Sequence, residues 1–171
     1  SRGLGDVYKR QHREGRMKKF RFKLEKYLDV TRRRKEEAER RFAEASRRLE
    51  EARERLGQLL AEMAQGQKDY AALIGAGKRI TVGTLMTYNS FFNWKRRQIE
   101  EQQQVILDCQ MEKQKRLKEL MDMMSRLKSI EQLKAKRLQE YKDAVLLEEN
   151  KLLDEIGLQL YMRRSRQEEH A

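Results

Sequence analysis

Few residues in this sequence are of the types that carry out catalysis or bind metals. The two histidines, His12 and His170, lie near the ends of the chain, and Cys109 is its one cysteine. Neither histidine has a cysteine or a carboxylate cluster nearby at metal-ligand spacing. Cys109 falls on an apolar helical stripe, where a small buried side chain is a simpler interpretation than a redox group. The sequence therefore predicts no catalytic residue, no metal site and no cofactor.

One glycine-rich stretch, Gly75-Ala-Gly77-Lys78, superficially resembles a phosphate-binding loop. A true loop of that kind needs a further glycine at fixed spacing before a Lys-Ser/Thr pair, and a strand before it. Both are missing. Paired glycines more often end a helix, so this stretch is interpreted as a turn between helices.

The composition favours long helices over a globular core. Charged residues make up 40% of the 171 residues, proline is absent and aromatic residues make up 7%. That much charge cannot be buried, and regular apolar spacing in such a chain is typical of a coiled coil. The formal net charge of +12 could attract nucleic acid or anionic lipid, but positive and negative residues are interleaved. A solvated surface is the simpler interpretation, and no apolar run is long enough to span a membrane.

A heptad pattern runs without a break through the first half of the chain. It favours a coiled-coil seam in which small and large side chains alternate. Twelve of its fifteen positions are apolar, and Thr31, Lys35 and Gly66 are the exceptions. The positions are Leu24, Leu28, Thr31, Lys35, Ala38, Phe42, Ala45, Leu49, Ala52, Leu56, Leu59, Met63, Gly66, Tyr70 and Leu73.

The pattern predicts an all-α fold, a long antiparallel two-helix coiled-coil hairpin whose second helix is the longer. We expect a non-native or disordered extension at 1–16, then the hairpin at 17–165, with helix one at about 18–74, a turn at 75–83, helix two at 84–165 and a tail at 166–171. Thr84 is the expected N-cap of the second helix. Folding back near residue 79 places Leu73 beside the region of Leu85, and Phe42 beside Arg116 and Leu117.

Two surfaces of this hairpin have no evident partner within the chain. The second helix runs on past the first by ~25 residues, or ~38 Å, and this overhang is rich in leucine from Leu146 to Met162. An apolar patch without a local partner usually marks a binding surface. The aromatic stretch Tyr88–Trp94 near the turn has two open interpretations, a hydrophobic cap that closes the turn or a partner-binding tip.

Three stretches of the chain resemble the flagellar FliJ family over about 17–165. They are Lys19-Phe-Arg-Phe-Lys-Leu-Glu25, Tyr88-Asn-Ser-Phe-Phe-Asn-Trp94 and Leu146-Leu-Glu-Glu-Asn-Lys-Leu-Leu-Asp154. The resemblance implies a two-helix hairpin that is a non-enzymatic component of the bacterial flagellar type III export apparatus. It also implies a cytoplasmic protein that regulates a partner ATPase and reaches the membrane only through its partners.

The resemblance also implies partners for the two surfaces. The hairpin tip would contact the membrane export-gate protein, and the end bearing both termini would enter the hexameric export ATPase; export chaperones are further partners. The implied gate-binding residues are Leu59, Met63, Tyr70, Phe91 and Gln102, and the implied ATPase-binding residues are Leu152, Ile156, Leu160, Arg163 and Arg164. Gly66 and Lys95 stand where the family pattern leads us to expect larger apolar or aromatic residues.

Three alternatives stay open from the sequence. A related virulence-type secretion stalk would differ only in its host apparatus. A basic coiled coil that binds nucleic acid or anionic membrane would use the net charge, although no nucleic-acid partner is expected. A purely structural homodimer would use the heptads alone. Neither of the last two accounts for the aromatic tip.

Overall fold

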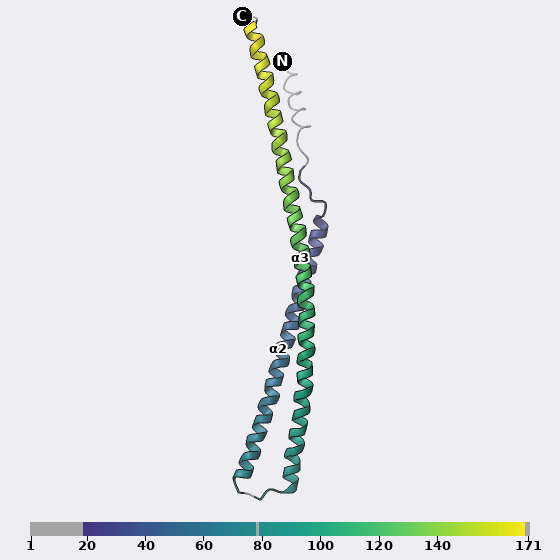
Figure 1. Ribbon diagram of the computed structural model, residues 1–171, viewed down its shortest axis with the longest axis vertical. Coiled ribbons are helices and arrows are strands. Elements are labelled where there is room, and N and C mark those ends of the chain that lie inside the picture. The colour runs from purple at the N-terminus through teal and green to yellow at the C-terminus, as the bar shows by residue number, and fades with distance from the viewer. Residues whose placement is uncertain (1–18, 78, 170–171) are drawn as a thin grey trace, which may run out of the picture. The chain divides into compact units, whose positions relative to one another are not determined.

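In the computed structural model, residues 19–77 and 79–169 are described, and they form two long helices and no strand. Helix α2 spans Glu25–Gly75 and helix α3 spans Val82–Glu169. Figure 1 shows the two helices joined by a short turn. The predicted all-helical hairpin with a longer second helix is confirmed. In these ranges, neither helix has a stretch apolar enough to cross a membrane.

The chain divides into two compact units. One is the hairpin end, residues 30–127, which contains the turn and the stretches of α2 and α3 on either side of it. The other combines residues 19–29 with residues 128–169 of α3.

Helix α2 buries the stripe that the heptad pattern predicts. Of its fifteen heptad positions only Leu24 is exposed, and it precedes the helix. Alanine and leucine alternate along the buried stripe, as at Ala45 and Leu49. Small side chains at alternate positions let the backbones approach while the leucines fill the space between them. The other faces of α2 are solvated, and they hold ion pairs such as Lys35–Glu39 at 2.6 Å.

The turn begins and ends with local capping. Helix α2 ends at Gly75, and Gly77 adopts a positive φ of 65°, a conformation that glycine reaches without steric cost. Thr81 caps α3, because the backbone N–H of Thr84 donates to its Oγ1 at 3.2 Å. The sequence-based choice of Thr84 as N-cap was therefore wrong by one helical turn. Thr84 lies inside the helix, and its hydroxyl lies 2.9 Å from that of Thr81.

Within the hairpin end, α2 and α3 pack within about one helical turn of the predicted register: Phe42 was expected beside Arg116 and Leu117 and contacts Lys113. The rings of Tyr70 and Tyr88 lie 5.2 Å apart near the turn. Farther along, the side-chain amide of Gln102 donates to the carbonyl of Ala52 at 2.9 Å. The Lys113 ammonium lies 5.9 Å from the centre of the Phe42 ring. These contacts agree with a fold-back near residue 79.

In the other unit, residues 19–24 before α2 are not helical, and the backbone N–H of Glu25 donates to the carbonyl of Phe22 at 3.2 Å in a turn. Phe20 packs on Tyr141 with ring centres 5.6 Å apart, and Phe22 is buried. Helix α2 therefore starts at Glu25 and not near residue 18. Glu25 pairs with Lys134 at 2.8 Å. The predicted extension at 1–16 lies outside the described residues, and α3 continues to Glu169, past the predicted boundary at 165.

The position of the seam predicts that replacing leucine by alanine destabilises the protein more at buried than at exposed positions of α2. Leu49 is 2% exposed and Leu60 on the same helix is 49% exposed. We expect Leu49→Ala to lower the free energy of unfolding by about 2–4 kcal/mol, because it leaves a cavity between two helices. Leu60→Ala should cost less than about 1 kcal/mol. Urea unfolding followed by circular dichroism measures both; equal losses would contradict the observed seam.

Candidate partner-binding surfaces

An aromatic cluster fills the seam next to the turn. Tyr70 from α2 packs between Tyr88 and Phe92 from α3, with ring centres 5.2 and 6.2 Å away. Phe91 adds an edge-on contact to Phe92 at 5.5 Å. Such tilted and edge-on pairs stabilise beyond their apolar area alone. Four of the tip aromatics are therefore at least half-buried against one another, as the hydrophobic-cap interpretation requires.

A lysine is buried directly behind this cluster. Lys95 is 5% exposed, its ammonium pairs with the carboxylate of Glu62 on α2, and it lies 4.9 Å from the centre of the Trp94 ring. A buried ammonium is costly unless it is paired, and both the carboxylate and the ring face stabilise it. The hydrogen bond from Lys95 lowers the pKa of Glu62 below its usual 4.5. This pair fastens α2 to α3 just beyond the tip.

Gly66 provides the space that Phe91 occupies. A Cβ atom at residue 66 would stand 2.5 Å from the nearest carbon of the Phe91 ring. Gly57 lies on the same helix, and nothing comes within 4 Å of a Cβ atom placed there. Glycine at residue 66 is thus explained by close packing, which the sequence pattern registered only as a missing apolar side chain.

The structure distributes the five predicted gate-binding residues over different environments. Leu59 is 2% exposed and lies in the seam, so its side chain offers no surface in this conformation. Met63, Tyr70 and Phe91 are half-buried. Gln102 is also half-buried, and its side-chain amide is engaged by Ala52. No observation tests a gate-binding role for any of the five.

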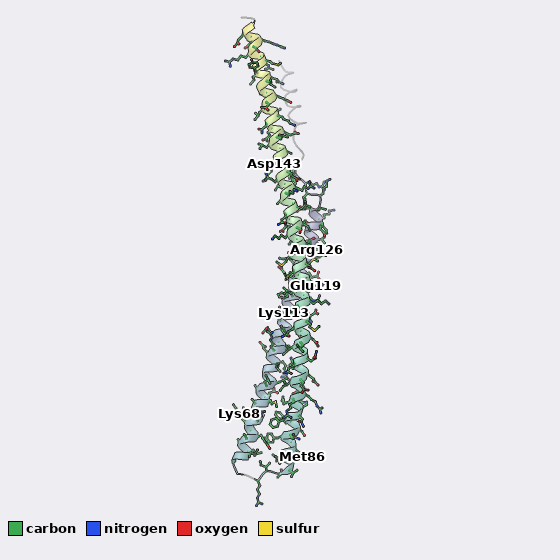
Figure 2. The ribbon with its side chains drawn as sticks, viewed as in Figure 1. Lys68, Met86, Lys113, Glu119, Arg126 and Asp143 are labelled. Atoms are coloured by element: carbon green, nitrogen blue, oxygen red, sulfur yellow. The ribbon has the colours of Figure 1, made fainter. Side chains whose placement is uncertain are left out.

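Sequence reasoning gave too little weight to the exposed apolar residues around the turn. Trp94 is 56% exposed, although it stands beside buried Lys95. Val82, Leu85 and Met86 in the first turns of α3 are exposed as well, and Figure 2 labels Met86 near the turn. The sequence could have indicated their exposure, because they lie off the heptad stripe and a two-helix hairpin cannot bury residues there. These four residues form the exposed tip surface.

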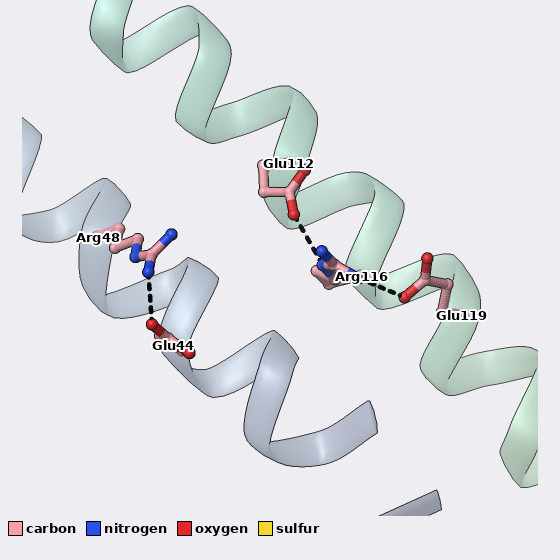
Figure 3. A network of polar contacts seen from close by, with 5 residues as sticks. All are labelled: Glu44, Arg48, Glu112, Arg116 and Glu119. Atoms are coloured by element: carbon pink, nitrogen blue, oxygen red, sulfur yellow. Dashed lines mark hydrogen bonds and ion pairs between the residues drawn. The ribbon is translucent and has the colours of Figure 1, made fainter. Parts of the chain in front are cut away.

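The flanks of both helices are held by ion pairs within each helix. Figure 3 shows Arg116 bridging Glu112 and Glu119 at 2.7 and 3.0 Å on α3. The hydrogen bonds that Arg116 donates to Glu119 and Glu112 raise the pKa of its guanidinium above the ordinary value. On α2, Arg48 pairs with Glu44 at 2.6 Å. Such exposed pairs contribute little to helix stability and do not define a site.

In the second unit, the end of α3 carries an apolar surface on which none of the described residues 19–77 and 79–169 packs. We call residues 146–162 the overhang segment. Its large apolar side chains are all exposed: Leu146, Leu147, Leu152, Leu153, Ile156, Leu158, Leu160, Tyr161 and Met162. The three apolar residues predicted for ATPase binding are among them, and Arg163 and Arg164 after them are exposed too.

Helical geometry sorts the overhang segment into two faces. At about 100° per residue, Leu152, Ile156 and Leu160 share a face with Leu146 and Leu153. Leu147, Leu158, Tyr161 and Met162 fall on another face of the same segment. A helix that is apolar on more than one side is usually buried on more than one side.

Comparison with known proteins gives a family for this chain. The sequence profile described as "Flagellar FliJ protein" matches residues 20–166. The chain belongs to the flagellar FliJ protein family. No match is found among curated proteins. A solved structure titled as a putative YscO homologue from Chlamydia trachomatis shares 19% sequence identity, with a TM-score of 0.65, over 86% of this chain and 99% of that one.

The structural likeness shows that the two chains share a fold, whereas family membership rests on the sequence profile. FliJ proteins are non-catalytic components of flagellar protein export, so the family does not call for an active site. The described part of the chain holds no cluster of three or more potential metal ligands. His12 and His170 lie outside it. The candidate sites of this FliJ-family chain are therefore surfaces, namely the exposed tip surface and the overhang segment.

The two glycines of α2 provide a matched test of the tip packing. Gly57→Ala should stabilise the FliJ-family chain by about 0.5–1 kcal/mol, because alanine is the better helix former and nothing opposes its methyl group. Gly66→Ala should lose this gain and displace the Phe91 ring, with a change in the fluorescence of neighbouring Trp94. Urea unfolding and emission spectra measure both; an equal gain in both variants would contradict the close contact.

The Lys95–Glu62 pair predicts a pH-dependent stability. A carboxyl whose pKa is lower in the folded than in the unfolded state contributes stability above the unfolded pKa, and this is lost as the pH falls through the folded value. We expect wild type to be more stable than Glu62→Gln at neutral pH, and the difference to vanish once the pH is well below 4.5. In Lys95→Met, the Glu62 pKa measured by NMR should return toward 4.5. An unchanged value would show that Lys95 is not the cause.

Proposed function

We propose that this FliJ-family chain links the export ATPase of the flagellar type III apparatus to the membrane export gate. The overhang segment would bind the hexameric ATPase, and the exposed tip surface would bind the gate protein. The chain itself would perform no chemistry and would regulate its partner ATPase. It would lie in the cytoplasm, reaching the membrane face through these partners, and it would also assist export chaperones.

The observation that carries the proposal is the exposure of the overhang segment. Nine large apolar side chains in water are unfavourable by roughly 25 cal/mol for each Å² of apolar surface. A solvated helix normally keeps such residues on a single stripe. Apolar residues on two faces fit a partner that contacts the helix from several sides, as the subunits of a ring would. Arg163 and Arg164 would add contacts to acidic groups of that partner.

The structure of the tip supports the part of the proposal in which the chain binds the gate protein. The buried aromatic cluster, Lys95 and Glu62 hold the turn in one arrangement, so a partner meets a preformed surface and does not have to order it. Exposed Trp94 and Met86 are the residue types that most often dominate such contacts. Tyr70 and Phe91 would then contribute mainly by supporting this surface, with their exposed edges as additional contacts.

Two pairs of substitutions test ATPase binding and gate binding separately. Ile156→Asp with Leu160→Asp places charge on the overhang segment and should abolish retention of the purified ATPase in a pull-down. Trp94→Ala with Met86→Ala should leave ATPase retention unchanged but lower swimming motility and gate binding. Both pairs lie on exposed surface, so circular dichroism should show intact helices.

Each pair is the control for the other. Retention of the ATPase by the overhang variant would contradict ATPase binding by the overhang segment. Normal swimming of the tip variant would contradict gate binding by the exposed tip surface. A related virulence-type secretion apparatus would need the same two surfaces. Rescue of motility in a flagellar deletion strain of the source organism distinguishes the flagellar assignment from that alternative.

A further inference from the structure

A third exposed apolar surface lies within the hairpin end, away from both surfaces discussed above. We call it the α3 flank stripe, and it consists of Leu107, Met111, Leu117, Met121 and Met124. Their side chains are between 39% and 70% exposed. At about 100° and 1.5 Å per residue they fall within an arc of roughly 140° and span about 26 Å along the helix. Five large apolar side chains share this arc with the exposed polar residues Gln110, Gln114 and Lys118, and a group of this kind differs from single exposed residues, which need no explanation.

Next to this stripe is a groove between the two helices. Its volume is about 510 Å³, and Leu49 of α2 lines it together with Leu107 and Met111 of the stripe. The groove and the stripe together offer what a third helix needs, a row of apolar contacts with a recess beside it. Three of the five stripe residues are methionines, whose flexible side chains adapt to a partner's shape.

The charges around this surface indicate the kind of helix. Arg53 and Lys113 line the groove with three glutamines and no acidic residue. Lys118 is exposed on the stripe itself, and Figure 2 labels Lys113 part-way along α3. Arg53 already shares its charge with Glu50 at 2.8 Å. Among the residues that the structure describes, neither Lys113 nor Lys118 forms an ion pair with a carboxylate; the Lys113 ammonium lies over the Phe42 ring, and Lys118 is exposed.

The same charges disfavour a second copy of this chain as the occupant. In a two-fold symmetric pair, each copy would present the same patch to the other. The groove lining of both copies, which carries Arg53 and Lys113 and no acidic residue, would then bring charge of the same sign into one interface, which is unfavourable. An acidic helix avoids this cost and neutralises Lys113 and Lys118.

We propose that the α3 flank stripe docks an amphipathic helix of a partner protein, with leucine-sized residues on its apolar face and carboxylates along its edges. The inference goes beyond the proposed function, because it uses neither the exposed tip surface nor the overhang segment. The bound helix would lie along α3 and turn this part of the hairpin into a three-helix bundle.

The test uses the full chain and two synthetic peptides labelled with fluorescein. Both are 18-residue helical peptides with leucines at i, i+3, i+4 and i+7 spacing; one carries glutamates along its edges and the other carries lysines. Fluorescence anisotropy should show saturable binding of the acidic peptide and binding at least about tenfold weaker for the basic one. Equal affinity for the two peptides would overturn the charge argument.

Variants locate the binding. Met111→Glu with Met121→Glu should weaken binding of the acidic peptide by about tenfold or more, whereas Met86→Glu, an equally exposed methionine at the tip, should have no effect. Lys113→Glu with Lys118→Glu should reverse the preference between the peptides. Ile156→Asp with Leu160→Asp should leave peptide binding unchanged. This control separates the peptide result from a failure of the proposed ATPase binding by the overhang segment.

Three results would overturn the proposal. The first is unchanged peptide binding in Met111→Glu with Met121→Glu, and the second is loss of binding in the overhang variant instead. The third is a dimer of the chain in sedimentation experiments that Met121→Glu dissociates, because the occupant would then be a second copy. Circular dichroism of every variant confirms that the helices are intact.

Discussion

A pair of helices can bury only one stripe on each helix, and this constraint governs the whole molecule. Along α2 the stripe is filled by alternating alanine and leucine, and the remaining faces of the helix are exposed to solvent. A large apolar side chain off the stripe has no site within the hairpin that could bury it. In a globular domain an exposed leucine carries little information, whereas here a group of them marks a candidate binding surface.

Polar residues interrupt the stripe where α2 meets α3 behind the tip. Lys95 occupies a seam position, and its ammonium is stabilised by Glu62 and by the rings of Trp94 and Phe91. Apolar residues at that position would bury more surface but would fit several registers equally well. A polar residue with a single partner penalises the others, as buried polar residues do in other coiled coils. The Phe91 ring over Gly66 has the same effect, since a shift of one turn would bring side chains into its space.

The heptad rule accounts for what could be predicted from the sequence. It predicts both helices and the fold-back near residue 79, because both depend on periodicity and chain length. The N-cap was missed because Thr81 and Thr84 are equally good candidates. The non-helical start was missed because a helical pattern does not describe the packing of Phe20 and Phe22. Leu59 was assigned to a surface by resemblance, although its own heptad position already predicted burial. The α3 flank stripe was overlooked because a single period describes only one face.

The exposed apolar residues are distributed unequally between the two helices. On α2 they are few, among them Leu60 and Ile74, and the surface is otherwise dominated by charged and polar residues, including arginine–glutamate pairs. On α3 they recur from Val82 to Met162. Since both helices satisfy the same seam, packing alone cannot require this difference. It follows if α2 serves mainly to hold α3 in a fixed register and α3 presents the contacts, so that one continuous helix carries the tip, the flank and the overhang. On this view the additional length of α3 is a functional surface, and the shorter helix needs only to extend as far as the register has to be held.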